Sequence, residues 1–251
     1  MGSEHRRQLV ASLVVLLAMT SCATTPGGKA KDAGDPYAAY VWPPPPDEAK
    51  IRLVQIITGR ADVEGGDSAL QKTLIGASPA TPFDKLVKPH GVAYDRQGRL
   101  LVTDSGSRAL LRFDREGGRF DVLGTTGSDP LQVPLGLGVG PDGAFFVADA
   151  GLRKVAAFDA DGERVGTIGS PGDFVNPTDV AVSPDGSRLF VADSKDHTIK
   201  IVDRKTGAIA EKFGGRGTGP GEFAWPTSLA FDPTGNLWIV DQLNCRLQVF
   251  D

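Results

Sequence analysis

Short apolar runs alternate with polar turns over the last two thirds of the chain, and the same order recurs four times. Each unit opens on a proline, passes a glycine turn and continues into an apolar run that ends in aspartate. These runs cover residues 100–103, 144–148, 189–192 and 237–240. They are rich in β-branched and aromatic residues and are too short for helices, so they predict strands that are buried on both faces. Sheets should therefore pack on sheets.

The repeats also have a regular length. Their opening residues are Pro89, Pro134, Pro177 and Pro226. The spacing of roughly 45 residues is typical of propeller blades. Turns such as Pro141-Asp142-Gly143 combine the fixed φ of proline with the positive φ of glycine, which suits tight hairpins. We predict four antiparallel strands per unit, with units starting near residues 88, 133, 176 and 225.

The repeat resembles the NHL family of β-propellers. The resemblance rests on the stretch Asn-Cys-Arg-Leu-Gln-Val-Phe-Asp at residues 244–251 and on the glycine-rich connector at residues 213–223. It extends over about residues 88–251. It implies an all-β propeller of the NHL type, with six blades in the complete family fold. A fold of this kind does not specify an activity, because function depends on the site it carries.

The last repeat stops at Asp251, without the fourth strand expected in the other repeats at residues 120–124, 164–169 and 208–213. A similar segment, residues 51–59, precedes the first repeat. We predict that it is the outer strand that closes the ring, and we expect about two further repeats beyond Asp251. A four-bladed ring closed by the same segment is the alternative, since rings of four to eight blades exist.

The N-terminus has the pattern of an export signal. A basic start, His5-Arg6-Arg7, precedes an apolar core at residues 9–19 that is too short to span a bilayer. The following Thr20-Ser21-Cys22 resembles a bacterial lipobox, which implies cleavage after residue 21 and lipidation of Cys22. An ordinary cleaved signal is the alternative. Alanine after the cysteine implies an outer-membrane lipoprotein facing the periplasm.

Residues 22–50 are predicted to be a linker between this anchor and a propeller at residues 51–251. Its first part is rich in glycine, and its second part contains four consecutive prolines at residues 43–46. The first part should be flexible and the second a stiff, extended spacer. A proline-rich ligand for an aromatic groove is the other interpretation of the second part.

The net charge and the cysteine content argue against nucleic-acid binding and against a disulfide. A formal net charge of −4 does not favour general nucleic-acid binding. The two cysteines are Cys22 and Cys245. If Cys22 is acylated, Cys245 is a lone thiol without a disulfide partner.

Few residues suggest chemistry. Each repeat has an aspartate at the end of its second strand, and we predict that these accept backbone N–H bonds rather than bind metal. They are Asp104, Asp149, Asp193 and Asp241. Beyond the signal only His90 and His197 are histidines, too few for a three-histidine zinc site. The strand openings offer one carboxylate, Asp179, too few oxygens for calcium. We therefore predict no catalytic residues, metal or cofactor.

Loops on one edge of the blades form the candidate binding face. Exposed arginine and tryptophan are residue types that anchor interfaces. The candidates are His90, Arg108, Arg153, Lys154, His197, Trp225, Asn244 and Arg246. We predict a membrane-anchored envelope scaffold that binds a protein or peptide and is not an enzyme. The alternatives are a metal-dependent lyase or lactonase completed by further repeats, and a glycan-binding module.

Overall fold

The structure is a computed structural model that describes residues 36–66, 73 and 79–251. The predicted signal and Cys22 lie outside the described residues. The chain divides into two compact units, one ending at Ile56 and one running from Ile57 to Asp251. Within the described parts, no helix has both the length and the apolar character needed to cross a membrane.

The first unit contains a small antiparallel sheet in which β1 (Val41–Trp42) pairs with β2 (Ile51–Arg52). The Lys50 N–H donates to Trp42 O at 2.8 Å, and the Leu53 N–H donates to Tyr40 O at 2.9 Å. The prolines at 43–46 therefore lie in a chain reversal, because antiparallel pairing brings the two flanking segments together. This corrects the expected extended spacer.

The predicted closing strand at residues 51–59 is strand only at Ile51–Arg52, which pairs with β1. Its pairing with the last blade stays a prediction. Further along, Gly59 forms an isolated bridge with Lys85. The backbone hydrogen bonds of this segment lie at its two ends, at residues 51–53 and 58–59.

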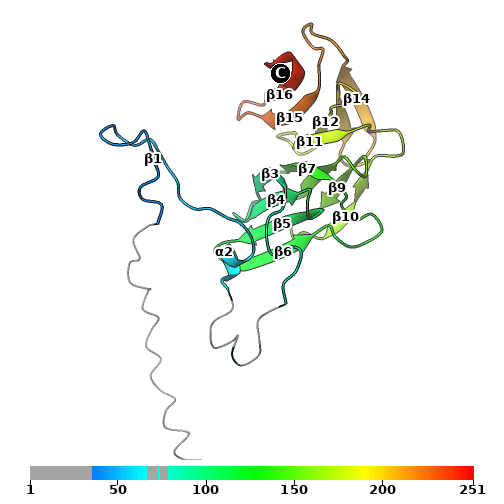
Figure 1. Cartoon of the computed structure of the whole chain (residues 1–251). Helices are drawn as coiled ribbons and strands as arrows, with labels where there is room; N and C mark the ends of the chain where they lie inside the picture. Colours follow the sequence, from blue (N-terminus) through cyan, green and yellow to red (C-terminus); the bar gives the residue numbers. More distant parts are fainter. Residues whose placement is uncertain (1–35, 67–72, 74–78) are drawn as a thin grey trace, which may run out of the picture. The chain divides into compact units, whose positions relative to one another are not determined.

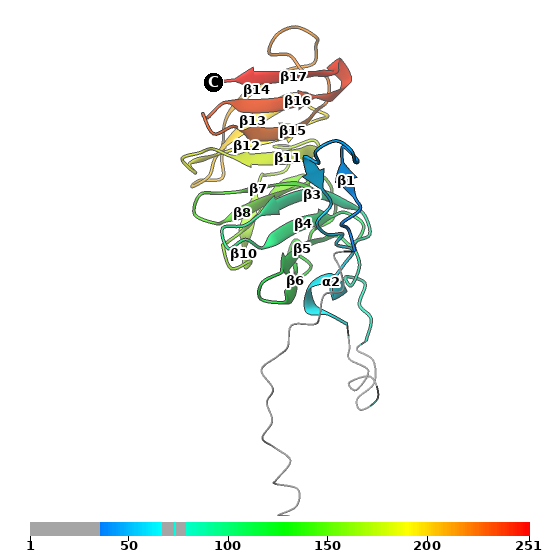
Figure 2. The same ribbon diagram turned by 90° about the vertical axis from the view of Figure 1, so that its left-hand side faces the viewer.

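The second unit consists of four antiparallel sheets, which we call blades 1 to 4 (Figures 1 and 2). Blade 1 contains β3 (Pro89–Tyr94), β4 (Leu100–Asp104), β5 (Ala109–Asp114) and β6 (Arg119–Leu123). Blade 2 contains β7 (Pro134–Val139), β8 (Phe145–Asp149), β9 (Lys154–Phe158) and β10 (Arg164–Ile168). Blade 3 contains β11 (Pro177–Val182), β12 (Arg188–Asp193), β13 (Thr198–Asp203) and β14 (Ile209–Gly214). Blade 4 contains β15 (Pro226–Phe231), β16 (Leu237–Asp241) and β17 (Arg246–Phe250), with the 3-10 turn η1 (Gln242–Asn244) before β17.

These blades confirm the predicted all-β propeller arrangement. Each sheet follows chain order from its inner to its outer strand, and the inner strands β3, β7, β11 and β15 contact one another in sequence. Figure 2 shows the sheets following one another from β6 to β17. Among the described residues β17 has no strand on its outer side.

Apolar side chains fill the spaces between neighbouring blades, because adjacent residues of one strand point to opposite faces. Phe145 packs towards blade 1 with Leu101 and Leu110, and its ring stacks on Phe158 of its own blade at 5.2 Å. Its neighbour Phe146 packs towards blade 3 with Val180 and Leu189. Both faces of these strands are therefore buried, as the apolar runs predicted.

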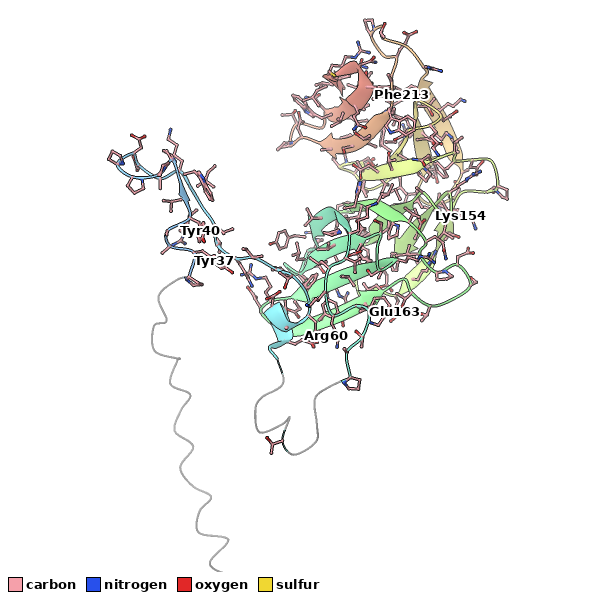
Figure 3. All side chains as sticks on the ribbon, in the orientation of Figure 1. Tyr37, Tyr40, Arg60, Lys154, Glu163 and Phe213 are labelled. Carbon is pink, nitrogen blue, oxygen red and sulfur yellow. The ribbon has the colours of Figure 1, made fainter. Side chains whose placement is uncertain are left out.

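The free face of blade 1 is partly covered by residues 57–64 and 83–86 of the same unit. Ile57 and Leu86 pack against its core, and so does Val63 of the short helix α2 (Ala61–Glu64). The guanidinium of Arg60, labelled in Figure 3, lies 4.9 Å from the ring centroid of Phe120. These segments thus shield apolar surface of the first blade.

Candidate functional site

One edge of the propeller carries the start of each inner strand and the loop between the second and third strands. We call this edge the loop face. The loops repeat one backbone geometry, in which the residue before the third strand has a positive φ of 51° to 57°. These residues are Arg108, Arg153, His197 and Cys245. Successive blades therefore present one side chain each from an equivalent position.

The repeated aspartates hold the base of these loops. Asp149 accepts N–H bonds from Gln132 and Val133 of the preceding connector, and from Gly151 and Leu152 of its own loop, at 2.7 to 2.9 Å. Its side chain is completely buried. The carboxylate thus links the connector to the loop.

Asp104 makes the equivalent four bonds in blade 1, with Val87, Lys88, Gly106 and Ser107. Burial raises its pKa, but these backbone N–H bonds together lower the pKa below the usual value. The carboxylate is therefore held in its charged form.

In blades 3 and 4 the repeated aspartate also takes a charged partner. Asp193 accepts a bond from Lys200 Nζ at 2.6 Å, and Asp241 accepts one from Arg246 Nε at 2.8 Å. All four repeated aspartates are completely buried. Every described contact of these residues is a structural bond within the repeat.

Two of the predicted binding residues, Asn244 and Arg246, form hydrogen bonds with the connector before blade 4. Arg246 donates to the carbonyls of Thr218, Gly219 and Glu222 in the connector before blade 4, at 2.7 to 2.8 Å. Asn244 Nδ2 donates to Gly217 O at 2.9 Å. Their polar groups stabilise the connector.

Lys154, labelled in Figure 3, also has a charged partner: its Nζ forms an ion pair of 3.2 Å with Asp129. By contrast Arg108 and Arg153 are exposed, and neither guanidinium has a hydrogen bond or ion pair within the described part of the chain. These two arginines are the freely available cations of the predicted set.

His197 and Trp225 connect blade 3 to blade 4. The backbone N–H of Trp225 donates to Nδ1 of His197 at 3.2 Å, and the two rings meet edge to face with centroids 6.3 Å apart. Trp225 itself has a positive φ of 67°. Since Nδ1 accepts a hydrogen bond, the imidazole proton is on Nε2 in this geometry.

An axial pocket of about 250 Å³ opens beside the starts of the inner strands. Each inner strand has a β-bulge there, just after its opening proline. Bulges redirect side chains, which is why they are frequent near functional sites. The lining residues are His90, Gly91, Val92, Gly136, Leu137, Thr178, Asp179, Thr227, Ser228 and Leu229.

Asp179 is the carboxylate of this pocket. Its Oδ2 accepts the Leu229 N–H from blade 4 at 2.8 Å, and its Oδ1 accepts the Val180 N–H at 2.9 Å. Burial raises the pKa of Asp179 to about 7, although both hydrogen bonds act to lower it. The carboxyl therefore titrates near neutral pH.

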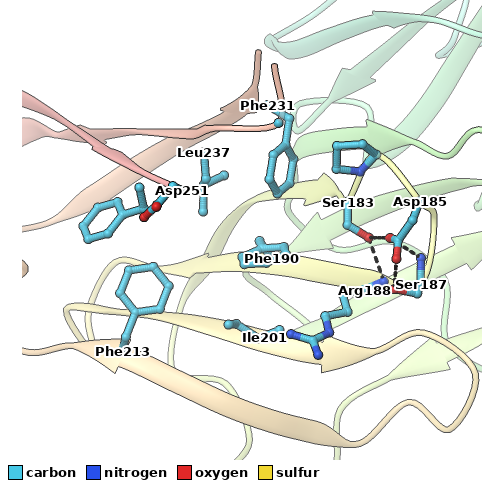
Figure 4. Close-up of a pocket in the computed structure, with 13 residues that line it drawn as sticks. Ser183, Asp185, Ser187, Arg188, Phe190, Ile201, Phe213, Phe231, Leu237 and Asp251 are labelled. Atoms are coloured by element: carbon cyan, nitrogen blue, oxygen red, sulfur yellow. Dashed lines mark hydrogen bonds between the residues drawn. The ribbon is translucent and has the colours of Figure 1, made fainter. Parts of the chain in front are cut away.

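A larger cavity of about 640 Å³ lies between blades 3 and 4, at the edge opposite the loop face (Figure 4). Its walls are aromatic: Phe190 meets Phe231 edge to face at 5.2 Å, and Phe213 lies 5.0 Å from Phe250. At its rim, hydrogen bonds from Ser183 and Ser187 lower the pKa of Asp185 to about 2. Phe250 and Asp251 also line the cavity, so the end of β17 contributes to its wall.

No group of three or more histidine, cysteine, aspartate or glutamate side chains is placed to hold a metal ion within the described residues. Cys245 is a free, exposed thiol. The predicted lipidation residue, Cys22, falls outside the described part.

Two family models match the chain. A 6-bladed β-propeller family (DUF5128) matches residues 174–251, and the NHL repeat matches residues 86–113. Together with the four blades, these matches define a β-propeller. Its first blade is similar to the NHL repeat.

Solved structures support the same fold. A streptogramin B lyase structure is 18% identical with a TM-score of 0.54, and the alignment covers 68% of this chain and 56% of that one. For virginiamycin B lyase from Staphylococcus aureus the values are 16%, 0.52, 70% and 58%. For Kuenenia stuttgartiensis hydrazine synthase they are 17%, 0.50, 70% and 52%. The alignments thus span a little over half of each of these structures. No curated protein matches the chain in sequence.

Proposed function

We propose that this propeller is a non-catalytic scaffold of the cell envelope that binds a protein or peptide on its loop face. The observation that carries the proposal is the pair of exposed arginines, Arg108 and Arg153, at equivalent loop positions of neighbouring blades. Their charges lack partners within the described residues, whereas Lys154, Asn244 and Arg246 are already bonded. Arginine is enriched among the residues that dominate binding energy at interfaces.

The His197–Trp225 contact extends this surface towards blade 4. Both side chains are half-buried. A tryptophan held in place by a neighbouring ring loses little conformational freedom on binding, which favours its use as an anchor. We therefore assign Arg108, Arg153, His197 and Trp225 to the partner-binding surface, with His90 at the axial pocket.

Membrane attachment through Cys22 belongs to the same proposal and rests on the sequence alone. An exported, acylated cysteine would tether the propeller to the envelope, at the outer membrane in a host with two membranes. Metabolic labelling with a clickable fatty acid should mark the protein, and Cys22→Ala should release it into the soluble fraction. Membrane retention of the unlabelled variant would contradict the anchor.

Peptide selection tests the binding function. Peptides selected from a display library on the immobilised full chain should lose affinity for a variant carrying Arg108→Glu and Arg153→Glu, by about tenfold or more, which corresponds to about 1.4 kcal/mol. A control variant carries Arg115→Glu and Lys205→Glu, which are exposed basic residues of turns at the opposite edge. Equal affinity for both variants would contradict the proposed surface.

A lyase is the second candidate, because the axial pocket brings His90 and Asp179 into one cavity and two of the similar solved structures are lyases. A catalytically inactive virginiamycin B lyase with quinupristin is a further structure of similar fold. Incubation of the full chain with quinupristin, followed by mass spectrometry, tests this candidate. Turnover that is lost in His90→Ala would favour the enzyme over the scaffold.

A further inference from the structure

The axial pocket is lined by one carboxylate and by no lysine or arginine among the described residues. Each oxygen of Asp179 accepts one backbone N–H bond. An ionised carboxylate offers about four acceptor positions. Asp179 therefore retains capacity for further hydrogen bonds after its two backbone bonds are made.

The backbone fixes this carboxylate in place. Gly136 of blade 2 lies so close that a methyl group there would sit 1.9 Å from Oδ1 of Asp179. On the other side, the Leu229 N–H of blade 4 donates to Oδ2. Asp179 thus reaches from blade 2 to blade 4 across the start of β11. The packing of the three inner strands β7, β11 and β15 therefore fixes the side-chain position of Asp179.

The rest of the lining suits the end of a long basic side chain. Thr227 and Ser228 present hydroxyl groups that have no hydrogen-bond partner within the described residues, and Val92, Leu137 and Leu229 add apolar surface. Lysine and arginine pack their methylene stems on apolar surface while their charged ends bind polar groups. A volume of about 250 Å³ is below the roughly 300–1,000 Å³ of drug-sized ligand sites. It matches one side chain better than a whole small molecule.

We propose that the axial pocket binds one ammonium or guanidinium group carried by the partner peptide, with Asp179 as the principal acceptor. Hydrogen bonds between two charged groups are roughly twice as strong as those between neutral groups. This proposal rests on the proposed scaffold function and specifies its partner, which must place a lysine or arginine over the propeller axis. Arg108 and Arg153 would bind other groups of the same partner.

Amide NMR of the full chain tests the proposal with defined probes. The first probe is a short peptide with one lysine, acetylated at its N-terminus and amidated at its C-terminus. The second is the same peptide with Nε-acetyllysine, and the third is n-butylamine. The Leu229 and Val180 amides report on the site because both donate to Asp179.

Saturable shifts of these two amides are expected with the lysine peptide and not with the acetyllysine peptide. Equal shifts with both peptides, or no shift with either, would overturn the proposal. Butylamine that bound as tightly as the lysine peptide would overturn the assignment to a peptide side chain, since the pocket would then take free amines. Shifts produced by calcium ions but not by these probes would identify a metal site instead.

Variants separate the pocket from the fold. Asp179→Asn should lower the affinity for the lysine peptide by about tenfold or more, and Ser228→Ala, which keeps Asp179, should lower it to a smaller extent. The control is Asp161→Asn, an exposed turn carboxylate without a bonded side chain among the described residues. If Asp179→Asn does not fold, Ser228→Ala still tests the proposal. Unchanged affinity of Ser228→Ala for the lysine peptide, together with equal amide shifts for the lysine and acetyllysine peptides, would overturn the proposed binding of a cation in the pocket. If the lysine peptide binds as expected, but the Arg108→Glu and Arg153→Glu substitutions do not lower the affinity for the selected peptides, the proposed function is contradicted and the pocket is not.

Discussion

The Trp225 backbone N–H donates to Nδ1 of His197 at 3.2 Å, which ties the connector of blade 4 to the loop of blade 3. His197→Ala should leave this half-buried N–H without its acceptor and remove the ring contact. We expect a loss of about 1 kcal/mol in the free energy of unfolding, measured by urea denaturation. His197→Asn is the matched variant, since asparagine tolerates positive φ and offers a short acceptor. A loss equally large for both would show that the imidazole acceptor is not the cause.

Asp149→Ala should destabilise the fold strongly. The substitution leaves four part-buried N–H groups of the connector and loop without their acceptor. Since an unsatisfied group costs about 1–3 kcal/mol when it is buried and less when water reaches it, a loss of roughly 3 kcal/mol in unfolding free energy is expected for the four together. The control, Asp161→Ala, should stay within about 0.5 kcal/mol of the native chain, as surface substitutions usually do. Similar values for the two variants would contradict the bracing role.

Substitutions of Arg246 and Arg108 should have different effects on thermal stability, although both arginines lie in loops of the same face. Arg246→Gln removes charge-assisted bonds to Asp241 and to connector carbonyls, so it should lower the thermal midpoint. Arg108→Gln should not change the midpoint, because its guanidinium has no partner among the described residues. Thermal unfolding monitored by circular dichroism compares them. An equal decrease in the thermal midpoint of both variants would contradict a structural role for Arg246 that Arg108 does not share.

Asp179 should make stability depend on pH. The pKa of its carboxyl is near the ordinary value of 3.8 in the unfolded chain and about 7 in the fold. Between these values the unfolded chain binds fewer protons, so stability falls as pH rises, by up to about 1.4 kcal/mol per pH unit. The contribution is fully present below about pH 4 and lost above about pH 7. Asp179→Asn should flatten the curve in this window. A curve that is identical in the variant would contradict the raised pKa.

The sequence predicted the blades well because their signals are local. The run at residues 144–148 combines aromatic and β-branched residues between a glycine turn and Asp149, and it forms β8. Turn chemistry and strand period are properties of short segments, so they need no knowledge of distant contacts. The closing strand at residues 51–59 depends on a long-range pairing, which composition does not specify, and local pairing with β1 involves only its first two residues.

The candidate site was predicted only in part for the same reason. The repeat pattern placed Arg246 where the loop meets the last strand, as the structure has it, but its bonds to carbonyls of residues 218–222 depend on how the connector folds back. Asp179 was visible as the one acidic residue at a strand opening. Its bond to Leu229 and its contact with Gly136 arise from the packing of neighbouring blades, which no single repeat reveals.

Site-specific photo-crosslinking tests the central claim most directly. A benzophenone amino acid would replace Lys195, an exposed residue of the β12–β13 loop on the loop face, or replace Arg115 on the opposite edge as a control, in the full chain expressed in its own host. The scaffold account predicts that one discrete protein or peptide is crosslinked from position 195 and not from position 115, and that this product disappears when Arg108→Glu and Arg153→Glu are added. Equal crosslinking from both positions, or a product from 195 that is unaffected by these two substitutions, would contradict a binding surface on the loop face.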